Sequence, residues 1–193
     1  MLDRQPTCRV HDVELVPTYK LLRVYEGLLS VARYRSIIQA AIRSRRGSPS
    51  TSCQTLIADR MIQVDILTLL PERPIPLHDH PGSAGVLLVL SGSISIDQYD
   101  MIPSRRDCRT KTLVELRRVS CKDLALGGVS LFARDRGNIH SMRAITERSV
   151  VLDIVAPPYR RQERSWFFRL SVDPASERGT FARLRARTEI AYA

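Results

Sequence analysis

Apolar side chains recur at helical spacing near the start of the chain. The positions that carry them are Leu21, Leu22, Tyr25, Leu28, Leu29, Ala32, Ile38, Ala41 and Ile42. This period predicts one amphipathic helix over residues 18–46. Gly47 is a natural helix stop, and the polar residues after it predict a loop over 47–54. We expect the helix to pack on the outside of a sheet; the alternative is an element that docks on a membrane surface or a partner.

From residue 61 onward the pattern changes to that of short strands. Candidate strands cover residues 62–66, 86–90, 93–99, 112–119, 129–133, 139–145, 150–155 and 166–172. Turn residues separate them, which indicates an antiparallel sandwich or barrel. The stretch 180–190 fits either a strand or a helix. We therefore expect an N-terminal helical segment and linker over 1–54 and a β domain over 55–193.

Composition and charge limit the binding partners and the cellular compartment that we expect for this protein. The 193 residues carry a net charge of +10. The arginines are spread along the chain without a recognition motif, which favours a basic surface over a nucleic-acid site, although nucleic-acid binding stays an alternative. We expect no secretory signal and no membrane span. Four cysteines without a CxxC pair predict free thiols in a reducing compartment, which we take as the cytoplasm or the nucleus.

Three of the four histidines fall into a pattern typical of metal ligands. His78 and His80 are separated by one residue, and His140 lies in a second distinctive stretch. Alternate residues of a strand share a face, so His78 and His80 can point into one cavity while Asp79 points away. Three neutral imidazoles suit divalent iron, zinc, copper or nickel, and they leave coordination positions open for a substrate.

Two ordered motifs resemble a known family. The first combines Pro76-Leu-His-Asp-His-Pro-Gly82 with residues 89–100, and the second combines Gly137-Asn-Ile-His-Ser-Met142 with residues 150–159. Both are similar to motifs of the thiol dioxygenases called cysteamine dioxygenase and plant cysteine oxidase. The resemblance runs from about residue 62 to about residue 168. It implies a mainly β cupin fold, a double-stranded β-helix or jelly-roll barrel, here with an N-terminal amphipathic helix.

The resemblance also implies a chemistry. Its members use iron(II) and molecular oxygen to convert a thiol to a sulfinic acid, and their substrates are cysteamine or a peptide that begins with cysteine. By position, His78, His80 and His140 match the iron ligands. Asp153 matches an acid that lines the active site, and Tyr159 matches the tyrosine that closes the segment. We expect a monomer.

The chain also departs from the family pattern. Residues 164–168 contain no cysteine or tyrosine, so a cysteine–tyrosine crosslink at that place is excluded. Ala84 occupies the position where many cupins have a ligand glutamate, and the family lacks this acid too. Several alternatives stay open: a non-catalytic cupin that binds a metal or a ligand, a zinc- or nickel-dependent isomerase, a purely structural acid at Asp153, and a packing role for Tyr159.

Overall fold

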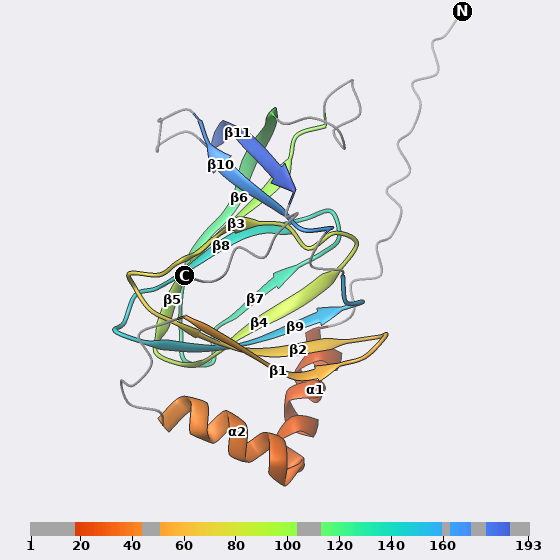
Figure 1. Ribbon diagram of the computed structural model, residues 1–193, viewed down its shortest axis with the longest axis vertical. Helices are drawn as coiled ribbons and strands as arrows, with labels where there is room; N and C mark the ends of the chain where they lie inside the picture. Colours follow the sequence, from red (N-terminus) through yellow and green to blue (C-terminus); the bar gives the residue numbers. More distant parts are fainter. Residues whose placement is uncertain (1–17, 44–50, 104–112, 160–162, 171–176, 186–193) are drawn as a thin grey trace, which may run out of the picture.

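Two helices and two β-sheets make up the computed structural model, which describes residues 18–43, 51–103, 113–159, 163–170 and 177–185 (Figure 1). The helices are α1 (Thr18–Ser30) and α2 (Ala32–Arg43). The prediction of one continuous helix is wrong, because the helix breaks at Val31, whose amide N–H donates to the carbonyl of Leu28 instead. Residues 44–46 of the predicted helix lie outside the described residues.

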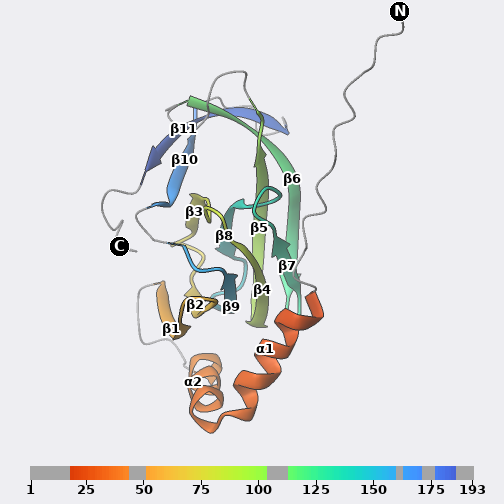
Figure 2. The ribbon, with the colours of Figure 1, turned by 90° about the vertical axis from the view of Figure 1, so that its right-hand side faces the viewer.

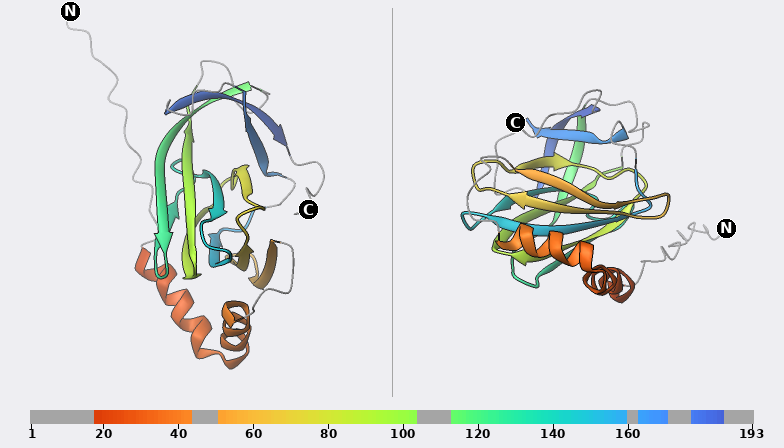
Figure 3. Two further views of the ribbon diagram at one scale, coloured as in Figure 1. Left: turned by 90° about the vertical axis from the view of Figure 1, so that its left-hand side faces the viewer. Right: turned by 60° about the horizontal axis from the view of Figure 1, so that its bottom comes forward.

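The break between the helices has a packing reason. Leu28 of α1 and Ile38 of α2 both lie in the core beneath the sheet. In one straight helix, residues ten positions apart would differ by roughly 80° in direction and about 15 Å in height. The break lets both side chains face the same sheet, and Figure 3 shows the two helices crossing its outer face. The predicted packing of this segment on the outside of a sheet is confirmed.

The sheet that these helices cover has five antiparallel strands. Their order across the sheet is β1 (Ser52–Ala58), β2 (Gln63–Leu69), β9 (Ser149–Ala156), β4 (Ala84–Ser91) and β7 (Val129–Phe132). β1 begins at residue 52, so the prediction of a loop over 47–54 is wrong for residues 52–54, while residues 47–50 lie outside the described residues. The proposed division of the chain at residues 54 and 55 falls within this strand.

The remaining six strands close into a ring. Their order is β10 (Ser165–Arg169), β11 (Arg178–Arg185), β6 (Leu113–Ala125), β5 (Ser93–Met101), β8 (Ile139–Ala144) and β3 (Ile75–His78). The ring closes where Trp166 of β10 pairs with His78 of β3. The ambiguous stretch 180–190 is thus a strand up to residue 185, and residues 186–190 lie outside the described residues. Figure 2 shows β10 and β11 crossing one end of the long strands β5 and β6.

The three central strands of the five-stranded sheet, β2, β9 and β4, are buried on both faces. Val64, Leu152 and Ile154 point toward the helices, whereas Leu67 and Val151 pack with residues of the ring. A third cluster, which includes Tyr99, Phe167 and Phe181, fills the end of the molecule near β10 and β11. The predicted mainly β cupin barrel is confirmed, with two N-terminal helices in place of one.

Two further expectations can be compared with the described residues. Neither helix in this part of the chain is long and apolar enough to cross a membrane. Cys121 is an exposed thiol that forms no disulfide. Cys8 and Cys108 lie outside the described residues.

Candidate metal centre

The three predicted histidines come from three different local structures. His78 is the last residue of β3, and His80 follows it in the turn before β4. The expectation that both lie in one strand is therefore wrong, although their side chains still converge. His140 is on β8, where it is the direct cross-strand partner of His78. Ring closure of the barrel and the pairing of β3 with β8 together bring the trio to one point.

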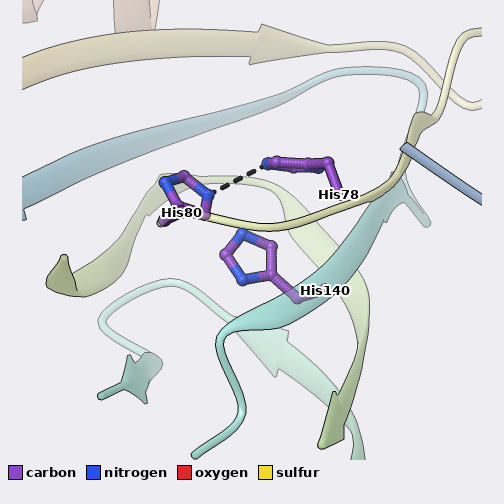
Figure 4. Close-up of side chains that lie close together, drawn as sticks. All are labelled: His78, His80 and His140. Atoms are coloured by element: carbon purple, nitrogen blue, oxygen red, sulfur yellow. Dashed lines mark hydrogen bonds between the residues drawn. The ribbon is translucent and has the colours of Figure 1, made fainter. Parts of the chain in front are cut away.

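The three imidazoles form a compact, buried cluster. Each pair of rings has a centroid separation of 4.8 Å. One nitrogen from each ring lies within 4.8 Å of the others, and none of the three residues exceeds 2% exposure. The Nε2 atoms of His78 and His80 are 3.0 Å apart (Figure 4). The structure therefore brings together all three histidines that the sequence predicts as metal ligands.

Asn138 fixes the turn that carries His80. Its side-chain oxygen accepts a hydrogen bond from the His80 amide at 2.7 Å. Its amide nitrogen donates to the carbonyls of His80, Ser83 and Ala133 at 3.0–3.1 Å. Asn138 is buried, so these bonds satisfy a polar group that would otherwise be costly. The sequence analysis does not assign this positioning role, although Asn138 stands two residues before His140.

Asp79 anchors the same turn from the other side. Its carboxylate accepts a hydrogen bond from the Ser165 amide at 2.5 Å and lies 3.8 Å from the guanidinium of Arg183. The Asp79 amide in turn donates to the Ser165 carbonyl. Burial raises the pKa of Asp79, while Ser165 and Arg183 oppose this shift. Asp79 thus ties the turn to β10, in keeping with the expectation that it points away from the histidines.

The electrostatic environment keeps the imidazoles neutral. Burial, together with the charge of Arg164, lowers the pKa of His140 to about 3, against the opposing effect of a hydrogen bond with the Gly137 backbone. Burial is also the main cause that lowers the pKa of His78 and of His80 well below the ordinary value. A neutral imidazole has a lone pair available for a metal, whereas an imidazolium does not.

The hydrogen bonds and unsatisfied atoms fit a metal site. Nδ1 of His78 lies 2.8 Å from the Pro76 carbonyl, to which it donates, so Nε2 keeps its lone pair toward the cluster. Nδ1 of His80 and both ring nitrogens of His140 have no hydrogen-bond partner, although they are buried. Buried polar atoms are rarely left in this state without a further partner. A divalent cation that is coordinated by imidazole nitrogen would be such a partner.

A pocket opens beside His78. Asp153 of β9 and Tyr159, the two other predicted site residues, both line it. The Tyr159 ring also stands edge-on to the ring of His80, with centroids 4.9 Å apart. Burial, with the neighbouring charge of Asp65, raises the pKa of Asp153 to about 7, while Arg164 opposes the shift.

Three further polar residues in this pocket are absent from the sequence predictions. They are Gln63, Asp65 and Arg164. The Arg164 guanidinium donates to the Tyr159 hydroxyl and lies over the faces of Tyr159 and Trp166, at 5.3 and 5.4 Å from the ring centroids. The pocket therefore combines carboxylates, a cation and a phenol next to the histidine cluster.

Comparison with known protein families identifies the family of this chain. The sequence profile described as PCO_ADO matches residues 7–188, nearly the whole length. The chain belongs to the PCO_ADO family. This membership confirms the resemblance inferred from the two histidine motifs.

Two relatives that are similar in sequence are named as an oxidase and a dioxygenase. Plant cysteine oxidase 1 of Arabidopsis thaliana is 30% identical, over 79% of this chain and 47% of that protein. Human 2-aminoethanethiol dioxygenase is 29% identical, over 44% of this chain and 38% of that protein. The chain thus spans about half or less of the length of these relatives. A double-stranded β-helix protein from Klebsiella pneumoniae is similar in structure, with a TM-score of 0.44 and 16% identity over 62% of this chain and 86% of that one.

Proposed function

We propose that this protein is an iron(II)-dependent thiol dioxygenase that acts on cysteamine or on the N-terminal cysteine of a peptide. The observation that carries the proposal is the buried cluster of His78, His80 and His140, in which ring nitrogens of His80 and His140 have no hydrogen-bond partner. Family membership and the names of the relatives support the choice of a thiol as substrate. Two further parts of the proposal are predictions from the sequence: the protein is a monomer, and it is located in the cytoplasm or the nucleus.

The reaction is balanced without an external reductant. A thiol and one molecule of O2 give a sulfinic acid; sulfur loses four electrons and the two oxygen atoms gain them. When bound by the three histidines, iron(II) would supply the redox chemistry and hold the thiol sulfur as thiolate. The all-histidine ligand set adds no negative charge, so it favours binding of an anionic sulfur.

The surrounding residues orient the substrate and hold a proton. Asp153 lines the pocket beside His78, and in our proposal its carboxyl hydrogen-bonds to the substrate's amino group or takes up the thiol proton. A pKa of about 7 suits both roles near neutral pH. Tyr159 accepts a hydrogen bond from Arg164, which leaves its own O–H to point toward an oxygen atom of the reactants.

Oxygen uptake by metal-loaded protein tests the proposal. Protein loaded anaerobically with iron(II) is given O2 and either cysteamine or a peptide that begins with cysteine, and mass spectrometry follows the gain of two oxygen atoms. Labelled O2 should place both labels in the product. Asp153→Asn should keep its iron but lose most turnover. Iron binding without oxygen uptake on any thiol would instead indicate a non-catalytic metal-binding cupin.

A further inference from the structure

Two aspartates face each other in the wall of the pocket. Asp65 of β2 and Asp153 of β9 are direct cross-strand partners in the antiparallel sheet. Directly opposed side chains on neighbouring strands lie about 5 Å apart at Cβ. Both residues line the pocket, and they are only 6% and 8% exposed. The two aspartates are thus a buried part of the pocket wall and not a surface cluster.

Each aspartate has an oxygen without a partner. One carboxylate oxygen of Asp65 accepts a hydrogen bond from Gln63 at 2.6 Å, but Oδ1 of Asp65 has none. Oδ1 of Asp153 also lacks a hydrogen-bond partner. Like charges opposite each other destabilise a sheet, and buried acceptors without donors add to this cost. Two facing carboxylates in a pocket are therefore arranged for a ligand that brings positive charge and several N–H donors.

We infer that Asp65 and Asp153 together bind the amino group of the thiol substrate, so that Asp65 determines specificity for amine-bearing thiols. The inference rests on the proposed function. An ammonium group has several N–H donors, which match the two unpartnered oxygens. His78 lines the same pocket, so an amine held by the acid pair and a thiol directed at the histidine cluster would both lie within this one pocket. Removing one acid should weaken the amine contact and leave the thiol contact in place.

The test compares cysteamine with 2-mercaptoethanol, which carries a hydroxyl in place of the amine. kcat/KM is measured for both thiols with the iron-loaded wild-type protein, with Asp65→Asn and with Asp123→Asn. Asp123 is an exposed acid on β6 and controls for the loss of one negative charge. The Asp65→Asn substitution keeps the size of the side chain and an oxygen that can accept a hydrogen bond from Gln63, which limits the effect on folding.

We expect the wild type to prefer cysteamine, and Asp65→Asn to reduce this preference by roughly 10–100-fold, because hydrogen bonds to charged groups contribute about 1.5–3 kcal/mol. The loss should appear mainly in KM for cysteamine, with turnover of 2-mercaptoethanol little changed. Asp123→Asn should keep the wild-type preference. An equal loss for both thiols in Asp65→Asn, or a wild type that does not distinguish them, would overturn the inference.

A binding measurement separates this inference from the proposed function. Calorimetry without oxygen compares cysteamine and 2-mercaptoethanol binding to the same iron-loaded proteins. If no thiol is oxidised, the proposed function fails, yet amine-dependent binding that Asp65→Asn weakens would still support the acid pair as an amine site. Binding that is the same for both thiols, or no binding of either, would overturn it.

Discussion

The buried carboxyl group of Asp153 should make the stability of the metal-free protein depend on pH, and Asp153→Asn should remove this dependence. Burial and the neighbouring Asp65 raise the pKa of Asp153 from 3.8 to about 7 in the folded state. Between these values the folded protein binds more protons than the unfolded chain. The contribution of Asp153 is therefore fully favourable below pH 4 and is lost as the pH rises through 7.

The size of the effect follows from the shift. A difference of about three pKa units corresponds to about 4 kcal/mol at high pH, of which about 3 kcal/mol is lost between pH 5 and 8. Asparagine carries no charge and escapes this loss. The free energy of unfolding of Asp153→Asn, relative to wild type, should therefore rise by up to about 3 kcal/mol from pH 5 to pH 8.

The difference in the free energy of unfolding between wild type and Asp153→Asn isolates the contribution of Asp153. The buried histidines act in the opposite direction, because their folded-state pKa values are lowered and their contribution to stability increases with pH. Their effect is common to both proteins and cancels. The assay is urea unfolding at several pH values in the presence of a chelator, with Asp123→Asn as a surface control. A difference between wild type and Asp153→Asn that stays constant from pH 5 to 8 would show that Asp153 ionises as easily in the folded protein as in the unfolded chain.

Three substitutions test the metal centre and the sheet beside it. His140→Ala should abolish both iron retention, measured by metal analysis, and turnover; full activity would contradict its assignment as a ligand. Asn138→Ala should weaken iron binding by roughly 10–100-fold, as measured by metal titration, because the turn that carries His80 loses its anchor. Gly85→Ala should destabilise the protein by about 1–3 kcal/mol or more in thermal unfolding, since a Cβ there would lie 2.5 Å from the Ile154 carbonyl oxygen; an unchanged melting temperature would argue against this close packing.

The hydrophobic pattern predicts most strands but not the irregular ones. The first three residues of β1 (Ser52–Ala58) fall in the loop predicted over 47–54, because they continue a polar stretch, and the strand lies at the edge of its sheet, paired only with β2. β3 (Ile75–His78) has four residues and contains a proline, so it lacks the length and the alternation that identify a strand. The hydrophobic pattern does not predict the helix break at Val31, because this break depends on the shape of the sheet on which the helices pack. These elements are set by tertiary contacts rather than by local preference.

The candidate metal ligands were easier to predict than the residues that hold them in place. Histidine is rare in this chain, so a closely spaced pair with a third in a matching motif stands out. Asn138 and Asp79 act through hydrogen bonds to backbone atoms of residues distant in sequence, and nothing in their local spacing shows those partners. The sequence therefore shows which side chains carry the chemistry more readily than which ones fix their geometry.

Asp65 shows a different limit of pattern analysis. It lies in a strand that alternates between apolar and polar residues, and such a strand is usually taken to turn its polar face to solvent. Here α1 and α2 cover the face that carries Val64, so the opposite face, with Asp65, turns into the barrel toward the pocket. A helix packed on the outside of a sheet thus reverses the usual assignment: the polar positions of β2 become candidate site residues. The same reasoning applies wherever a sequence predicts an alternating strand together with an amphipathic helix that must cover one face of its sheet.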